Sequence, residues 1–214
     1  MTPPGATVAD SAQASAEASA QASAQASTQA TAPDTAPAGA PPALRRVSLR
    51  FMLGHPARWI ALGFGSGLAP GAPGTVGTLW AWAAFLVADP WLSASQWGWI
   101  IALSLAVGWW ACTRCAQHLG VADPGAIVWD EVLAFLLILW LVMPTGFWGQ
   151  AVAFGLFRYF DAAKPGPVGW ADRLFKLRAG QTIGWRQGFG ILFDDLVAAL
   201  CTLLVIAVWQ RFLA

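Results

Sequence analysis

The sequence predicts an all-α integral membrane protein with about four to five transmembrane helices and a glycine-rich, broken-helix loop. Of its 214 residues, 57% are hydrophobic and only 11% are charged, and the mean hydropathy is +0.55. An average soluble domain has about 25% charged residues. The chain also contains 14 Trp, a residue enriched where membrane helices meet the lipid headgroups. Five apolar segments separated by short connections complete the pattern, and no internal repeat is visible.

The first 43 residues are almost entirely Ala, Ser, Gln, Thr, Pro and Gly, with no basic or aromatic residue. Such a composition cannot bury a core, so we expect a disordered tail. The tail also lacks the basic start and continuous apolar stretch of a secretory signal.

Residues 44–61 carry four arginines among apolar side chains. This composition predicts a basic amphipathic lead-in that lies on an anionic membrane surface. The remaining residues, 62–214, form the expected membrane-embedded domain.

The domain opens with residues 62–78, whose many glycines and prolines favour a loop or broken helix. The apolar segments then cover residues 76–88, 97–112, 127–143, 147–160 and 188–209. The first and fourth are short for a hydrocarbon core of about 30 Å, so we expect them to tilt or to extend through flanking small residues.

Basic residues alternate between these connections. The lead-in has four, residues 113–126 have one and residues 161–187 have five, whereas residues 89–96 and 144–146 have none. Because basic loops stay on the cytoplasmic side, the tail, the second turn and the long loop 161–187 are expected there, with the C-terminus opposite.

Acidic residues gather at the expected cytoplasmic face from three apolar segments: Asp130, Glu131, Asp161, Asp194 and Asp195. Charged groups at membrane depth are costly unless they are paired, solvated or bound to a cation, and they usually mark function. Hard oxygen ligands without a cysteine cluster point to Mg²⁺. For any one acid the alternative is a solvated cap or an ion pair, such as Asp161 with Arg158 or Lys164.

Several groups on the same side could bind a phosphate. Backbone N–H groups in 65–67 and 74–77 precede a helix, and hydroxyls and two cations lie nearby in sequence. The candidate phosphate-binding residues are Ser66, Gly67, Gly74, Thr75, Arg158 and Lys164. The alternatives are a packing hinge for the glycines and snorkelling for the cations. Together with the acids, these groups predict metal-assisted phosphoryl chemistry.

Cys112 and Cys115, with His118 close behind, could form half of a zinc site. A structural zinc site needs four ligands and no second pair exists, so small apolar residues at a helix end are the favoured interpretation.

Four motif blocks occur in order in this chain. They are GFGSGLAPGAPGTVG at 63–77, IVWDE at 127–131, FRYFDAAKPGP at 157–167 and GFGILFDDLVA at 188–198. Their order and spacing resemble the bacterial phosphatidylglycerophosphatase A family, over residues 62–199 or so.

The resemblance implies a Mg²⁺-dependent phosphatase of the bacterial inner membrane. Its expected substrate is phosphatidylglycerol phosphate, which yields phosphatidylglycerol and inorganic phosphate in phospholipid biosynthesis. Residues 62–214 would then be the phosphatase domain, with its active site facing the cytoplasm. The five acids would be the metal-binding and catalytic residues, one of them left free as a base. A covalent route through Thr75 or Ser66 stays open, although neither has a base beside it in sequence.

We expect membrane lipid as a partner, no nucleic acid and no obligate protein partner. An ion-coupled transporter with intramembrane carboxylates is the alternative function. The acids argue against it because they lie at one rim and the chain has no inverted repeat. A purely structural membrane subunit would give no reason for five acids on one face.

Overall fold

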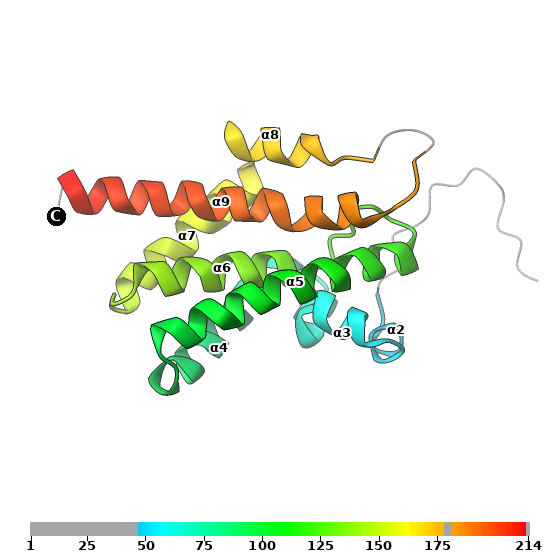
Figure 1. Cartoon of the computed structure of the whole chain (residues 1–214), viewed down its shortest axis with the longest axis horizontal. Coiled ribbons are helices and arrows are strands. Elements are labelled where there is room, and N and C mark those ends of the chain that lie inside the picture. The colour runs from blue at the N-terminus through cyan, green and yellow to red at the C-terminus, as the bar shows by residue number, and fades with distance from the viewer. Residues whose placement is uncertain (1–46, 178–180, 213–214) are drawn as a thin grey trace, which may run out of the picture. The chain divides into compact units, whose positions relative to one another are not determined.

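The computed structural model describes residues 47–177 and 181–212, so the prediction for residues 1–43 lies outside the described residues. Within these ranges the regular elements are all helical, which confirms the all-α class. In chain order (Figure 1) the elements are α2 (Leu49–Leu53), α3 (Pro56–Ala61), the 3-10 helix η1 (Gly63–Leu68), α4 (Pro73–Ala88), the 3-10 helix η2 (Asp89–Trp91), α5 (Ala94–Leu119), α6 (Trp129–Val142), α7 (Phe147–Ala163), α8 (Pro167–Leu174) and α9 (Trp185–Phe212).

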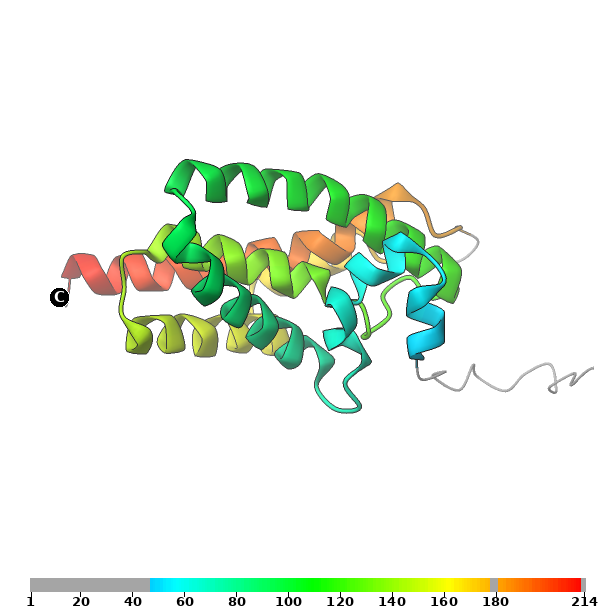
Figure 2. The same cartoon turned by 90° about the horizontal axis from the view of Figure 1, so that it is seen from below.

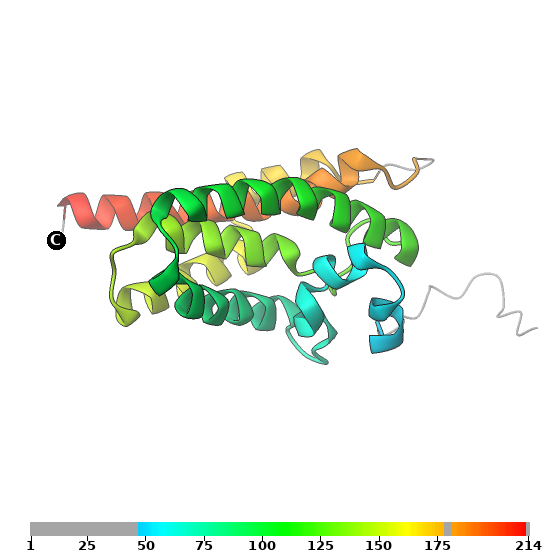
Figure 3. The ribbon, with the colours of Figure 1, turned by 60° about the horizontal axis from the view of Figure 1, so that its bottom comes forward.

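Helix α6 forms the centre of the bundle. Apart from its two acids its sequence is apolar, and most of its side chains, including Val132, Phe135 and Leu139, are fully or almost fully buried. A helix that is hydrophobic on all faces is stable when other helices or lipid surround it. It contacts α4, α5, α7 and α9, and Figure 3 shows it running between α5 and α4.

Helices α5 and α9 are long and apolar enough to cross a membrane, with 26 and 28 residues. At about 1.5 Å per residue they measure roughly 39 and 42 Å, against a hydrocarbon core of about 30 Å. Helix α5 begins with a capping box, in which Ser93 accepts from the Gln96 N–H and Gln96 accepts from the Ser93 N–H. It ends at Gly120, whose left-handed backbone (φ 68°) terminates the helix.

These two helices pack closely near the end of the bundle where α5 finishes and α9 starts. A side chain on Gly188 of α9 would collide with Thr113 of α5, so only glycine permits this approach. The Trp109 indole N–H also donates to the Trp185 carbonyl, at 2.7 Å. Because of this contact, the first turns of α9 lie beside the last turns of α5 (Figure 2).

The expected long loop 161–187 contains a helix. Helix α8 occupies residues 167–174 and lies along α9. Val168 and Ala171 are fully buried, while Trp170 and Arg173 point outward. An amphipathic helix of eight residues is too short for its period to stand out from a polar connection.

Candidate active site

Three carboxylates from two helices converge inside the bundle. Asp130 and Glu131 occupy the first turn of α6, and Asp195 lies in the third turn of α9. One carboxylate oxygen from each lies within 4.8 Å of the others. The packing of α6 against α9 therefore joins acids that are more than sixty positions apart in sequence.

Each of these acids has a buried oxygen without a partner. Oδ1 of Asp130, Oε2 of Glu131 and Oδ2 of Asp195 accept no hydrogen bond from any described residue. Burying unpaired carboxylate oxygens together is unfavourable, through lost hydration and mutual repulsion. A hard divalent cation offsets both penalties, and Mg²⁺ is usually bound through carboxylate oxygens together with water and phosphate oxygens. The residues at this point therefore fit a magnesium ion.

An arginine borders the carboxylates. Nη1 of Arg158, near the end of α7, lies 2.5 Å from Oδ2 of Asp161 and 3.8 Å from Oε1 of Glu131. Asp161 and Arg158 are one helical turn apart. Their ion pair is the alternative to metal binding that the sequence analysis gave for Asp161. Asp161 therefore holds the Arg158 guanidinium beside the carboxylate cluster.

The first turn of α4 also reaches this point. A side chain on Gly74 would collide with Oε1 of Glu131 and would lie 3.3 Å from Nη1 of Arg158. Pro73 has no N–H, and the Gly74 and Thr75 N–H groups have no acceptor in the preceding turn of their helix. The partial positive charge of this helix end thus lies beside Glu131 and Arg158, where it favours an anion.

The earlier part of the glycine-rich segment is differently arranged. The N–H groups of Gly65 and Gly67 both donate to the Leu62 carbonyl at 3.0 Å, and the Ser66 hydroxyl donates to the Gly63 carbonyl at 2.9 Å. These donors are satisfied within their own turn, where Gly67 packs against the Ala126 carbonyl. The phosphate-binding role of Ser66 and Gly67 stays a prediction that this geometry does not support.

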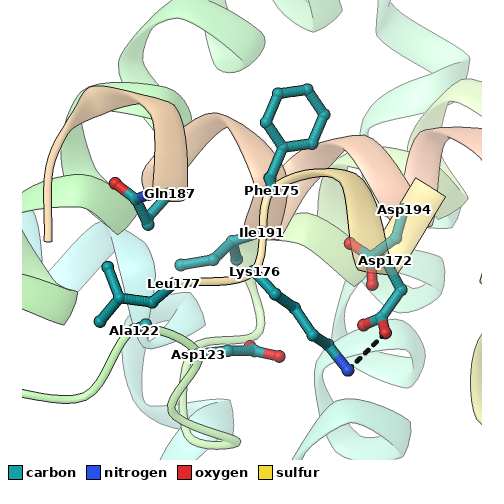
Figure 4. A pocket seen from close by; sticks show the side chains of 10 residues that line it. Ala122, Asp123, Asp172, Phe175, Lys176, Leu177, Gln187, Ile191 and Asp194 are labelled. Atoms are coloured by element: carbon teal, nitrogen blue, oxygen red, sulfur yellow. Dashed lines mark ion pairs between the residues drawn. The ribbon is translucent and has the colours of Figure 1, made fainter. Parts of the chain in front are cut away.

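A second network surrounds Lys164. Its Nζ lies 2.5 Å from Oδ2 of Asp194 and 2.7 Å from Oδ1 of Asp172, whose other oxygen lies 2.7 Å from Nζ of Lys176. Asp172 and Asp194 line a small pocket of about 70 Å³ together with Asp123 and Gln187 (Figure 4). Asp194 and Asp195 are consecutive on α9 and therefore face different networks, since neighbours on a helix point about 100° apart.

These ion pairs shift two pKa values outside the long helices. Partial burial lowers the pKa of Lys164, but hydrogen bonds to Asp172 and Asp194 outweigh it and raise that pKa above its ordinary value. For Asp172 burial raises the pKa, but the hydrogen bonds from Lys164 and Lys176 outweigh it and lower the pKa below its ordinary value. Both groups are therefore charged at neutral pH.

A model of the phosphatidylglycerophosphatase A family matches residues 59–210, a range that contains all of these groups. The chain belongs to this family. It is 36% identical to phosphatidylglycerophosphatase A of Escherichia coli strain K12 over 157 residues, which cover 71% of this chain and 81% of that protein.

Two further relatives match this chain over most of their own length. Phosphatidylglycerophosphatase A of Haemophilus influenzae is 31% identical over 170 residues, covering 79% of this chain and 96% of that protein. A protein of Bacteroides thetaiotaomicron named as a candidate phosphatidylinositol-3-phosphatase is 32% identical over 160 residues, covering 70% and 90%. No solved structure matches the chain.

The sequence analysis of this phosphatidylglycerophosphatase A family member did not identify Asp172 as a site residue. Asp172 lies in the segment that was expected to be a loop, and in the structure its two oxygens form ion pairs with Lys164 and Lys176. The spacing of Asp172 and Lys176, four positions apart, was a signal for a helical ion pair. It is a weak signal because such pairs are frequent on exposed helices.

Cys112 and Cys115 are not among the three grouped carboxylate ligands. Cys112 and Cys115 are buried in α5, and neither joins a metal-binding group within residues 47–177 and 181–212. His118 accepts a hydrogen bond from Arg58 Nε at 3.2 Å. This environment agrees with the packing interpretation of the pair.

Proposed function

We propose that this chain is a membrane-bound phosphomonoesterase that hydrolyses phosphatidylglycerol phosphate to phosphatidylglycerol and inorganic phosphate. Family membership supports the reaction class, and the two curated relatives named above as phosphatidylglycerophosphatase A support the substrate. The observation that carries the proposal is the convergence of three unpartnered carboxylate oxygens, an arginine and a helix N-terminus. Divalent cations, arginine and backbone N–H donors all stabilise the negative charge of a phosphate monoester.

In this proposal Asp130, Glu131 and Asp195 hold Mg²⁺. When bound, the ion supplies positive charge that offsets the charge of the phosphate. Water adds to phosphorus, the bond from phosphorus to the glycerol oxygen breaks, and that oxygen takes up a proton.

The chain's own groups orient the phosphate. Arg158 binds phosphate oxygens through its guanidinium, and Asp161 keeps that guanidinium beside Glu131. The free N–H groups of Gly74 and Thr75 donate to the same phosphate. Lys164, tied to Asp194 and Asp172, contributes positive charge at the neighbouring pocket.

We also propose that α4, α6 and α7 cross the bilayer beside α5 and α9, so that the chain passes through the bacterial inner membrane five times. These three helices have 16, 14 and 17 residues. At about 21 to 26 Å they are shorter than the hydrocarbon core, which thinning of the bilayer or anchoring residues can accommodate. Arg58, Arg114, Lys164 and Lys176 lie at the carboxylate end, which supports a cytoplasmic site.

The test is inorganic phosphate release from phosphatidylglycerol phosphate in mixed micelles, with and without EDTA. We expect release that EDTA abolishes and Mg²⁺ restores. Asp195→Asn and Asp130→Asn should lower the rate by at least about 100-fold, because each removes a negative charge that would hold Mg²⁺, the ion that offsets the charge of the phosphate.

The matched control is Asp89→Asn. Asp89 lies at the opposite end of the bundle and accepts a hydrogen bond from Trp97 Nε1 at 3.1 Å, which an asparagine oxygen can also accept. Its rate should equal that of the wild type. Phosphatidylinositol 3-phosphate serves as a second substrate because of the Bacteroides thetaiotaomicron relative. A folded wild type that releases phosphate from neither lipid would refute the proposal and revive the ion-coupled transporter alternative.

A further inference from the structure

Three features of the chain fix the position of Lys164 at the end of α7. Its backbone is left-handed (φ 45°), a conformation that helix ends usually give to glycine. A Pro-Gly-Pro segment, residues 165–167, follows directly, and each proline fixes one backbone dihedral. Gly169 of α8 packs against the Lys164 carbonyl, where a side chain would collide. Because lysine is strained in this conformation and glycine is not, we expect its side chain to have a role.

The Lys164 ammonium is held by carboxylates from two other helices. Nζ donates to Asp194 of α9 at 2.5 Å and to Asp172 of α8 at 2.7 Å. Among the described residues these two are the acceptors for Nζ, and an ammonium group has three N–H donors. Lys164 does not line the small pocket of Figure 4, although both acids do. One N–H donor is therefore left for a ligand.

Two short stretches of chain connect this network to the carboxylate cluster. On α7, Lys164 follows Asp161 by about one helical turn, and Asp161 holds Arg158 beside the cluster. On α9, Asp194 directly precedes Asp195. The pair of Lys164 with Asp194 therefore places the ammonium next to the residues proposed to bind the metal and the phosphate.

Asp172 has two lysine partners in different surroundings. One oxygen pairs with Lys164, whose side chain is 31% exposed, and the other pairs with Lys176, whose side chain is 64% exposed. Exposed ion pairs contribute little, because water screens them. Asp172 itself is mostly buried, so its stronger contact is the one with Lys164.

We propose that Asp172 is a positioning residue of the phosphatase reaction: with Asp194 it holds the Lys164 ammonium where the remaining N–H donates to a phosphate oxygen at the carboxylate cluster. The inference rests on the proposed function, which supplies the phosphate. Asp172 does not bind the phosphate, because two negative groups repel each other. The alternative is that its ion pairs only attach α8 to the neighbouring helices, in which case Asp172 affects stability and leaves phosphate affinity unchanged.

The first experiment is a double-mutant cycle on phosphate release from phosphatidylglycerol phosphate. Asp172→Asn should raise KM about tenfold and Lys164→Met about 30-fold, with kcat within about twofold, because a contact made equally in the ground state and the transition state appears in KM. The double variant should match Lys164→Met, since a residue that acts only through the lysine has no further effect once the lysine is gone. Loss of folded protein would instead lower the apparent kcat and leave KM unchanged.

Lys176→Met provides the comparison for a loosened α8. It removes the other ion pair of the same carboxylate and leaves Lys164 in place, so its KM should stay within about twofold of the wild type. A rise in KM equal to that of Asp172→Asn would overturn the proposal, as would an unchanged KM in Asp172→Asn or additive effects in the double variant. If Lys164→Met does not fold, the comparison of Asp172→Asn with Lys176→Met still decides.

The second experiment measures binding without hydrolysis and keeps this inference apart from the proposed function. Equilibrium dialysis of the full chain in detergent, with Mg²⁺ and radiolabelled inorganic phosphate, gives a Kd that should rise in the same ratios as KM. A wild type that binds phosphate with this pattern but hydrolyses neither lipid would refute the phosphatase and leave the role of Asp172 standing. Normal hydrolysis in a wild type whose Asp172→Asn variant changes only its thermal midpoint would refute the role of Asp172 alone.

Discussion

At the scale of single residues, Gly74 joins the glycine-rich segment to the acids. It is the point where the first turn of α4 touches Glu131 and Arg158. A methyl group there must displace the Glu131 carboxylate, the arginine or the helix end. The absence of a side chain at this position therefore determines the geometry of the site.

Gly74→Ala should reduce phosphate release by about 100-fold, because a displacement of about 1 Å within a catalytic site has effects of that size. Magnesium affinity should fall as well, since Glu131 moves. Gly71→Ala is the control, as no atom lies within 4 Å of the added methyl group, and it should be as active as the wild type. Kinetics in mixed micelles together with a thermal melt provide the measurement. Full activity in a well-folded Gly74→Ala would show that the contact is dispensable.

Most residues of the candidate site could be predicted from the sequence, because charged groups are too costly in apolar segments to be there without a role. The division of labour among them could not. Asp194 and Asp195 looked equivalent, yet the structure joins Asp195 to Asp130 and Glu131 and joins Asp194 to Lys164. That difference depends on the angle at which α9 packs, which the local sequence does not encode.

At the scale of elements, Asp172 of α8 pairs with Lys164 at the end of α7, and Lys164 also pairs with Asp194 of α9. Val168 and Ala171 of α8 are buried. The depressed pKa of Asp172 means that its pairs are complete above the ordinary aspartate pKa, about 3.9, and are lost as pH falls through the folded-state value. The raised pKa of Lys164 works in the opposite sense. Its contribution is complete below about pH 10.4 and is lost as pH rises through the folded-state value.

The contribution of Asp172 and Lys164 to the thermal midpoint in detergent should therefore stay constant between about pH 5 and pH 10. Asp172→Asn should lower the midpoint at pH 7 by roughly 2–4 °C, about 1 kcal/mol, because Lys164 keeps Asp194 as a partner and Lys176 is mostly exposed. It should also remove part of the loss of stability below pH 4.

The neighbouring Arg173→Gln serves as the control, because Arg173 is exposed on the same helix. Its melting curve should match that of the wild type across the pH range. An Asp172→Asn variant whose acid transition is unchanged would show that the network does not hold α8.

The elements themselves differ in how well the sequence predicts them. The apolar segments 97–112 and 188–209 lie within α5 and α9, because a long apolar run leaves few alternatives to a helix in lipid. The helices extend beyond these segments by several residues, since polar end residues continue the helix where the apolar pattern stops. Helix α8 could not be predicted because its stability comes from tertiary ion pairs and contacts with α9.

At the scale of the whole molecule, the connections divide between two ends of the bundle. The starts of α4, α6 and α9 and the ends of α5 and α7 gather near the carboxylates, and the turns 89–93 and 143–146 lie opposite. If the proposed orientation is right, α8 faces the cytoplasm and the turn before α7 faces the other side.

An impermeant maleimide tests this orientation. Phe147→Cys, at a position 60% exposed, should be labelled in cells whose inner membrane is intact. Trp170→Cys, at a position 55% exposed on α8, should be labelled only after that membrane is opened. Cys112 and Cys115 are buried but Cys201 is partly exposed, so Cys201→Ser is the background for both variants and, carrying neither new cysteine, is the control. The reverse pattern would place the carboxylates on the outer side and remove the cytoplasmic assignment.

The adjacent carboxylates of Asp194 and Asp195 have a consequence for how this enzyme can change. The two residues are neighbours on α9, but their side chains point in different directions and contact different groups. Together these contacts fix the rotation of α9 about its axis. A substitution that turns α9 to reshape the pocket of Asp172 also withdraws Asp195 from Asp130 and Glu131. Changes in the shape of this pocket must therefore arise through side chains on α8 or on the loop before α6, which also line it, while α9 keeps its orientation.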